Sequence, residues 1–243
     1  MNLVIDAGNT SVKLGWFDGD VLVRQRVMPV GADPVLPVPE NTDEIENALL
    51  AAVRDTPEDW LNTLTKRARL FIYGPTLLLP IINRYQSPST LGSDRMANAC
   101  GAFKLFPSQN VLVIDAGTCL KFDFVAEDGA YVGGSISPGL TMRYESLHRG
   151  TGRLPLLQPA ASAPLTGNDT ESSIHSGVIN GMCAEIEGIL DAYRKSYPDM
   201  KVLMTGGDAP FFLNRLKTSI FAAPSITLQG LNAILLQNVD SNA

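Results

Sequence analysis

One stretch of this 243-residue chain occurs twice. The first copy, residues 3–13, reads LVIDAGNTSVK, and the second, residues 113–123, reads VIDAGTCLKFD. Each copy begins with a Val- and Ile-rich run typical of a buried strand, passes through Asp, a small residue, Gly and Thr, and resumes as a second apolar run. The pattern predicts a hairpin whose glycine turn can bring backbone N–H groups to an anion. One copy would be compatible with an ordinary glycine turn, but a repeat predicts two related halves with a phosphate held between them.

The charge balance of the chain limits its partners. The net charge is −6 and the pI is near 4.9, without a run rich in Lys and Arg, so we expect no nucleic-acid partner. Cys100, Cys119 and Cys183 lie far apart without C-x-x-C spacing, which favours buried packing over a disulfide framework or a zinc site. The sequence shows neither a signal peptide nor a membrane-spanning segment. We therefore expect a cytoplasmic protein without a membrane partner.

Apolar runs of strand length alternate with segments of helical periodicity, which predicts an α/β fold. In the first half, the periodicity predicts an amphipathic helix over residues 43–55, capped by Thr42 or Asp43, after a proline-rich loop at residues 31–41. A further helix is expected over residues 77–85.

In the second half, a long helix is expected to start near Asn168, where Glu171 completes a capping-box pattern, and to end near Tyr197. Its apolar positions form one stripe, which is more often part of a core than of a subunit interface. The stripe comprises Ile174, Val178, Met182, Ile186 and Ile189.

Several short motifs follow the two hairpins in a fixed order, and together they resemble type III pantothenate kinase. This family belongs to the superfamily of acetate and sugar kinases, heat-shock ATPases and actin. The resemblance runs from residue 2 to about residue 238. Its motifs are D-x-G-N-T at Asp6–Thr10, G-x-D-R at Gly92–Arg95, D-x-G-T at Asp115–Thr118 and G-G-x-I-x-P-G at Gly133–Gly139. A stretch that begins at Thr170 and ends in Ser-Gly at Gly177 comes next, and a Gly-Gly turn follows at Thr205–Asp208.

The resemblance implies two related ribonuclease H-like halves, residues 1–109 and 110–243, facing each other across a nucleotide cleft. It also implies ATP-dependent phosphorylation of pantothenate to 4'-phosphopantothenate, the first step of coenzyme A biosynthesis. In the family the first hairpin holds the ATP phosphates, Asp6 lies near Mg²⁺, and Thr118 lies at the nucleotide. The implied nucleotide residues of the first hairpin are Asp6, Ala7, Gly8, Asn9, Thr10, Ser11, Val12 and Lys13.

The aspartate of G-x-D-R, here Asp94, resembles the family's proton acceptor. An acidic residue at the head of a helix is more often a cap, so that alternative stays open. Arg95 beside it would favour the ionised carboxylate and could bind an anionic substrate. The resemblance assigns pantothenate contacts to Tyr85, Gly92, Ser93, Asp94, Arg95 and Thr170, although Tyr85 could equally be an apolar residue at a helix end.

Asp115 resembles the family's ligand for a monovalent cation, usually K⁺ or NH₄⁺. The family usually reads Ala-x-Thr after D-x-G-T, whereas this chain reads Cys119-Leu120-Lys121. Lys121 could therefore place an ammonium group where the family has a hydroxyl, which puts the cation requirement in doubt.

The resemblance further implies a homodimer in which the pantothenate pocket is completed across the subunit interface. Two other functions are compatible with the motifs: another small-molecule kinase or phosphatase of the superfamily, and a non-catalytic nucleotide-binding transcriptional accessory protein. The Asp94-Arg95 pair favours the enzyme, since a regulator has no need of a base there.

Overall fold

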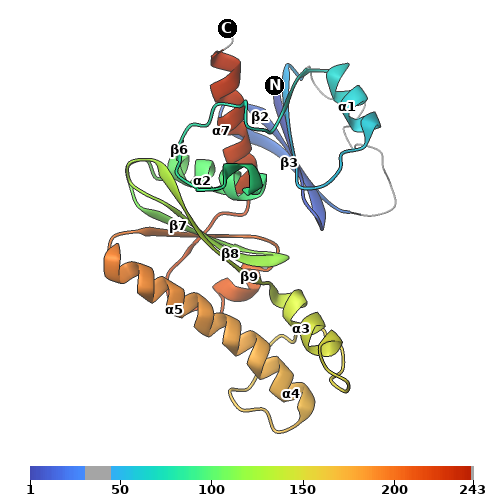
Figure 1. Cartoon of the computed structure of the whole chain (residues 1–243), viewed down its shortest axis with the longest axis vertical. Helices are drawn as coiled ribbons and strands as arrows, with labels where there is room; N and C mark the ends of the chain where they lie inside the picture. Colours follow the sequence, from blue (N-terminus) through green and yellow to red (C-terminus); the bar gives the residue numbers. More distant parts are fainter. Residues whose placement is uncertain (31–44, 242–243) are drawn as a thin grey trace. The chain divides into compact units, whose positions relative to one another are not determined.

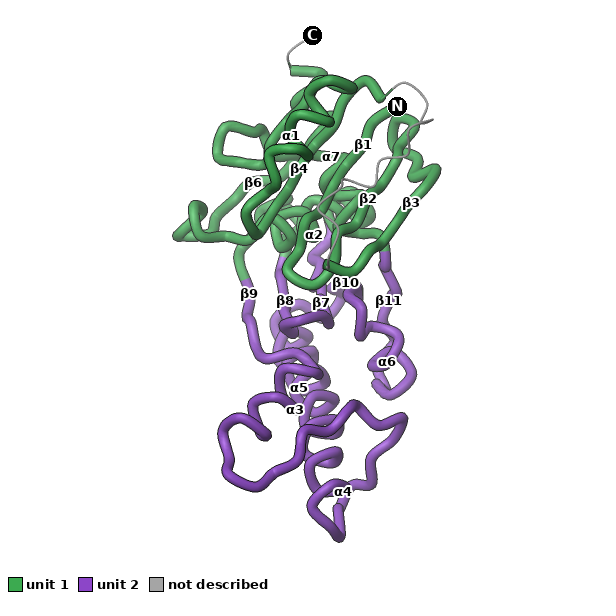
Figure 2. Tube along the Cα trace, turned by 90° about the vertical axis from the view of Figure 1, so that its right-hand side faces the viewer, with its two compact units in different colours: residues 1–108, 125–133, 225–243 green, residues 109–124, 134–224 purple. Residues whose placement is uncertain are grey.

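The structure is a computed structural model that describes residues 1–30 and 45–241. It divides into two compact units (Figure 2). The first unit comprises Met1–Ser108, Val125–Gly133 and Ser225–Ala243, and the second comprises Gln109–Phe124 and Gly134–Pro224. The predicted ranges 1–109 and 110–243 treated each half as continuous, whereas the chain returns to the first unit twice after residue 108.

The first unit is built on a five-stranded sheet with the order β3-β2-β1-β4-β5. Its central strand β1 is buried along its whole length, as its apolar sequence predicts. β1 pairs antiparallel with β2, so that Asp6 lies opposite Lys13, and parallel with β4. The strands are β1 (Asn2–Ala7), β2 (Ser11–Asp18), β3 (Val21–Pro29), β4 (Asn47–Ala52) and β5 (Arg69–Ile72).

Two helices predicted for this unit are wrong. Residues 47–52 form the buried strand β4 between β1 and β5, although periodicity predicted a helix over residues 43–55. Residues 77–85 contain only the short strand β6 (Ile82–Asn83), because Pro80 cannot donate a helical hydrogen bond. The proline-rich loop and the caps Thr42 and Asp43 lie outside the described residues. A helix that was not predicted, α1 (Glu58–Thr65), precedes β5.

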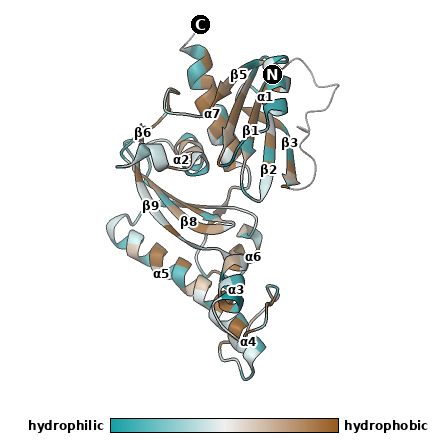
Figure 3. Cartoon of the chain, turned by 45° about the vertical axis from the view of Figure 1, so that its right-hand side comes forward, coloured by the Kyte–Doolittle hydropathy of each residue, from teal (hydrophilic) through white to brown (hydrophobic). Residues whose placement is uncertain are grey.

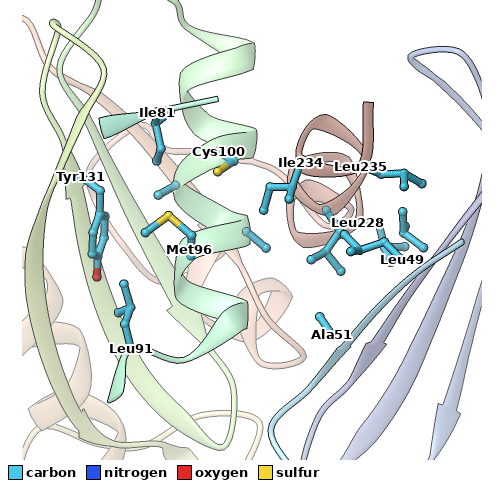
Figure 4. Close-up of a cluster of buried hydrophobic side chains, with 14 of the residues drawn as sticks. Leu49, Ala51, Ile81, Leu91, Met96, Cys100, Tyr131, Leu228, Ile234 and Leu235 are labelled. Carbon is cyan, nitrogen blue, oxygen red and sulfur yellow. The ribbon is translucent and has the colours of Figure 1, made fainter. Parts of the chain in front are cut away.

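The core of the first unit lies around helices α2 (Ser93–Leu105) and α7 (Ile226–Asp240), which lie side by side (Figures 1 and 4). Tyr131 and Ile81 pack on one side of α2, and Leu49 of β4 packs beside α7. The two helices approach each other very closely at two glycines. A Cβ atom added at Gly230 would lie 1.7 Å from the Ala97 carbonyl oxygen, and one added at Gly101 would lie 2.6 Å from that of Ile226.

A second sheet has six strands in the order β11-β10-β7-β8-β9-β6. Its strand β7 is buried from Val111 to Ile114, which fits a run buried on both faces. β10 pairs parallel with β7 and with β11. The remaining strands are β7 (Val111–Ala116), β8 (Cys119–Val125), β9 (Ala130–Pro138), β10 (Lys201–Thr205) and β11 (Phe221–Ala222).

The helices of the second unit are α3 (Leu140–Arg149), α4 (Thr170–His175), α5 (Gly181–Ser196) and α6 (Ala209–Leu213), with a π-helical segment (Ser176–Asn180) between α4 and α5. The long helix predicted from Asn168 is therefore present, but its cap is Asp169, which accepts from Ser172 N–H. Hydrophilic and hydrophobic residues alternate along α5 (Figure 3), and Met182, Ile186 and Leu190 are buried.

Of the predicted apolar stripe, Ile174, Val178, Met182 and Ile186 are buried within one chain, and Ile189 is half-buried. The α/β fold class is confirmed. Among the described residues, no helix is long and apolar enough to cross a membrane. Cys100 is buried, Cys119 and Cys183 are half-buried, and none of the three forms a disulfide.

Candidate active site

The first hairpin places two charged side chains opposite each other in the first unit. Asp6 is the penultimate residue of the buried strand β1, and its side chain is 6% exposed. Lys13 faces it from β2, with 3.5 Å between its Nζ and Asp6 Oδ2. This distance exceeds that of a normal hydrogen bond, so the two groups attract each other without forming one. The hairpin turn lies between these residues, and Asn9 and Thr10 at its tip are exposed.

The turn itself is held by backbone hydrogen bonds. Gly8 N–H donates to the Ser11 carbonyl at 3.0 Å, and Val30 N–H donates to the Thr10 carbonyl at 2.9 Å. The predicted nucleotide residues of this hairpin therefore comprise the short turn Gly8–Thr10 and the adjoining ends of β1 and β2. Such a turn can place several N–H groups around a phosphate.

Asp94 lies in the first turn of α2, where the helix N-terminus favours a negative charge. The cap position belongs to Gly92, so Asp94 is not the N-cap residue. Its Oδ1 accepts from the N–H of Arg95 at 2.8 Å. Ser93 is buried, and its hydroxyl has no hydrogen-bond partner among the described residues. The four residues Gly92–Arg95 thus form the first turn of one helix.

Tyr85 brings a ring to the same unit and is not part of a helix. The guanidinium carbon of Arg95 lies 5.6 Å from the centre of the Tyr85 ring, within the range of a cation–π interaction. The other neighbour is Gly133, which has a φ of +126°, and a Cβ added there would lie 3.4 Å from the ring. Tyr131 lies 6.0 Å away between ring centres. The positive φ is what favours glycine at position 133, and Tyr85, which packs beside this glycine, also contacts Arg95.

Tyr73 is a neighbour of the site that the sequence did not indicate. It follows β5 directly and is half-buried. Burial, followed by the Cys100 thiol and the Asp94 carboxylate, raises the pKa of Tyr73 to about 12. The phenol therefore remains a neutral hydrogen-bond donor within electrostatic reach of Asp94. Only its position after a strand, beside a glycine turn, could have indicated it.

The second hairpin holds a closer ion pair in the second unit. Lys121 Nζ lies 2.7 Å from Asp115 Oδ2, and the two side chains are 14% and 15% exposed. Thr118 lies exposed at the turn, and its nucleotide contact stays a prediction. The structure therefore confirms that Lys121 can reach Asp115, which the sequence had left open.

The turn after β10 closes against this hairpin. Asp208 N–H donates to the Ala116 carbonyl at 2.9 Å. Gly206 has a φ of +99°, and a Cβ added there would lie 2.7 Å from Asp115 Oδ1. Burial raises the pKa of Asp208. The Gly-Gly turn at Thr205–Asp208 therefore lies directly beside Asp115, within the second unit.

Thr170 lies elsewhere in the second unit, at the start of α4. It lines an open groove together with Leu147, Leu154, Gly167, Ile174 and Gly177. Thr170 and Gly177, the two ends of the Thr-led motif, therefore share one groove. The predicted encounter between Thr170 and Asp94 of another subunit stays a prediction.

Comparison with known proteins gives the family. The sequence model of type III pantothenate kinase matches residues 2–192. The type III pantothenate kinase of Christiangramia forsetii is 40% identical over 237 residues, covering 97% of this chain and 98% of the relative, and that of Bacteroides fragilis is 42% identical over 239 residues, covering 98% of each. This chain belongs to the type III pantothenate kinase family.

Solved structures support the fold of this family. A protein of Campylobacter jejuni named as a Baf family transcriptional activator aligns with a TM-score of 0.63 at 20% identity, covering 98% of this chain and 99% of that one. A protein of Sinorhizobium meliloti named as a 2-dehydro-3-deoxygalactonokinase aligns with a TM-score of 0.57 at 15% identity, covering 100% and 99%. MreB 5 of Spiroplasma citri also aligns over this chain, with a TM-score of 0.50 at 9% identity, so the chain shares its fold with proteins of dissimilar sequence.

Proposed function

We propose that this chain transfers the γ-phosphate of ATP to the primary hydroxyl of pantothenate, which yields 4'-phosphopantothenate for coenzyme A synthesis. The observation that carries this proposal is the first turn of α2, where Asp94 stands beside Arg95 and Tyr85 in a chain of the type III pantothenate kinase family. Phosphoryl transfer requires positioning and charge neutralisation more than covalent chemistry, and these side chains supply both.

Asp94 acts as the general base in this proposal. Its carboxylate accepts the proton of the pantothenate hydroxyl while that oxygen attacks the γ-phosphate. Arg95, whose guanidinium faces the Tyr85 ring, binds the carboxylate of pantothenate. Tyr73 adds a neutral donor near the base. Gly92 and Ser93 complete the substrate contacts at the helix N-terminus.

The first hairpin binds the ATP phosphates through its backbone N–H groups and Lys13. Mg²⁺ prefers one or two carboxylates together with waters and phosphate oxygens, and Asp6 offers one such carboxylate at the end of β1. When bound, Mg²⁺ would neutralise charge on the phosphates. Thr118 contacts the nucleotide from the second hairpin. A monovalent cation, K⁺ or NH₄⁺, fits Asp115 less well than Mg²⁺ fits Asp6, because the Lys121 ammonium already lies 2.7 Å from the Asp115 carboxylate.

The cytoplasm, where ATP is available, is the proposed location. We also propose a homodimer in which Thr170 contributes to the pantothenate pocket of the partner subunit. The groove that Thr170 lines supports a ligand or partner contact there, whereas the buried stripe of α4 and α5 does not. A transcriptional role has less support, because the chain carries a net charge of −6.

A coupled assay of ADP release with pantothenate tests the proposal. Asp94→Asn keeps the shape of the side chain but removes the proton acceptor, so turnover should fall by roughly a hundred- to ten-thousand-fold. ATP binding, measured by calorimetry, should persist because the first hairpin is unchanged. Asp59→Asn, in the first turn of α1, is the matched control and should remain active. Near-normal turnover by Asp94→Asn would show that Asp94 is not the base, and no pantothenate-dependent ADP release would refute the substrate.

A further inference from the structure

The second hairpin contains a buried ion pair between Lys121 and Asp115. Lys121 Nζ and Asp115 Oδ2 are 2.7 Å apart, which is the distance of a charge-assisted hydrogen bond. Both side chains are more than four-fifths buried. Water therefore screens the pair much less than it screens an ion pair on the surface.

The internal repeat explains why Lys121 lies there. The two copies align when Asn9, which has no counterpart in the second copy, is left out. Lys121 is then the counterpart of Lys13, and Asp115 is the counterpart of Asp6. Lys13 lies directly across the strand pair from Asp6, but its Nζ stays 3.5 Å from the carboxylate and its side chain is 29% exposed. The corresponding pair of the second hairpin is closer, at 2.7 Å, and its lysine is less exposed.

The surroundings of Asp115 leave little room for a coordinated ion. Lys121 holds Oδ2, and Gly206 approaches Oδ1 so closely that an added Cβ would lie 2.7 Å from it. A K⁺ ion needs a shell of oxygen ligands to replace its hydration. The donor set at Asp115 thus fits an ammonium group better than a free cation.

We propose that the ammonium group of Lys121 takes the place of the monovalent cation at Asp115. The Lys121 ammonium group and a bound monovalent cation each supply one positive charge beside the Asp115 carboxylate, so the local charge is the same in both cases. The lysine, however, is covalently attached and needs no ion from solution. A fixed positive charge at a nucleotide hairpin stabilises phosphate oxygens without reorganisation. Nucleotide binding and folding stability then become independent of K⁺ and NH₄⁺. The catalytic consequence, but not the ion substitution itself, rests on the proposed kinase function.

The wild-type protein gives the first test. The Kd for ADP, measured by calorimetry, and the unfolding temperature without ligand are compared in KCl, NaCl and tetramethylammonium chloride at equal ionic strength, so that screening is constant. We expect the Kd to agree within about twofold in the three salts, because a protein without a K⁺ site does not distinguish K⁺ from the other two cations. A twofold change in Kd corresponds to only about 0.4 kcal/mol of binding free energy. A severalfold tighter Kd in KCl than in both other salts would overturn the inference.

Two substitutions give the second test. Lys121→Thr restores the hydroxyl that the family usually has, and Lys121→Met removes the charge while keeping the length. In NaCl, both should weaken ADP binding by at least about tenfold, the scale of one charge-assisted hydrogen bond. In Lys121→Thr alone, KCl or NH₄Cl should restore binding and raise the unfolding temperature. ADP affinity unchanged in both variants, or an absence of K⁺ rescue in a folded Lys121→Thr, would contradict the inference.

The control is Lys104→Thr, which breaks an exposed ion pair with Asp20 in the first unit. It should show the wild-type Kd in every salt. The experiment also separates this inference from the proposed substrate, since ADP binding and unfolding require no pantothenate. If ADP binding follows the expected pattern but pantothenate is not phosphorylated, the ion substitution stands and the substrate proposal fails.

Discussion

At the scale of single residues, burial of Asp208 opposes its charge. Asp208 lies half-buried at the start of α6, and burial raises the pKa of its carboxyl group. Its side chain makes no capping hydrogen bond to that helix. The aspartate therefore loses hydration without gaining a cap, and its charged form is disfavoured in the folded state.

The sign of the pH dependence follows from this shift. Because the folded-state pKa of Asp208 is raised, its protonated form stabilises the fold at low pH, and that contribution is lost as pH rises through the folded-state pKa. Asp208→Asn should therefore raise the unfolding temperature at pH 7 by roughly 1–3 °C, and the gain should shrink below the ordinary pKa of Asp. Asp199→Asn, an exposed aspartate of the same unit, controls for the loss of charge. A gain that is the same at pH 7 and pH 3.5 would contradict this explanation.

At the scale of elements, the contact between α2 and α7 positions the candidate base. Asp94 lies at the start of α2, and α2 is held against α7 by a contact that only glycine permits. The Gly230 Cα approaches the Ala97 carbonyl so closely that no side chain fits between the helices. Thr227 of α7 also donates from its hydroxyl to Asn98 of α2 at 2.8 Å, in the buried part of this contact.

Gly230→Ala should therefore destabilise the first unit. The added methyl group forces the helices apart, and overpacking of this kind costs about 1–3 kcal/mol, or more where backbone blocks the space. We expect the unfolding temperature to fall by at least about 2 °C in thermal denaturation. Gly188→Ala, at an exposed position of α5 where an added Cβ meets nothing within 4 Å, should instead raise stability by roughly 0.5–1 kcal/mol. Equal effects of the two substitutions would mean that the helix contact is not closely packed.

The elements also show what the sequence could predict. The two hairpins were predicted because their glycine turns and apolar runs are local signals. The helix predicted for the residues of β4 was wrong. Their sequence, NALLAA, has high helix propensity, but pairing with β1 on one side and β5 on the other makes them a strand. The Lys121–Asp115 distance and the effect of Asp94 on the pKa of Tyr73 depend on side-chain geometry, which no spacing of residues specifies.

At the scale of the whole molecule, the proposed dimer makes a prediction about mixed subunits. Asp94→Asn and Thr170→Arg should each be inactive if each pocket takes Asp94 from one subunit and Thr170 from its partner. Exchange of the two variants should form heterodimers with one intact pocket, so that about a quarter of wild-type activity returns in an equal mixture. ADP release measures the recovery. Mixing Asp94→Asn with Arg95→Ala should restore nothing, since both defects lie in the same half of the pocket. Mixed dimers without recovered activity would place the pocket within one chain.

The path of the chain through the two units has a consequence for synthesis on the ribosome. The first unit begins at Met1 but is not complete until α7, residues 226–240, has been made. At roughly 5–20 residues per second, more than a hundred further residues after Ser108 take on the order of ten seconds to translate. During that time the apolar residues of β4 and α2 that α7 will cover, including Leu49 and Ala97, remain without their partner. The part of the nascent chain synthesised first is therefore the part that finishes folding last, and it is the natural target of a chaperone.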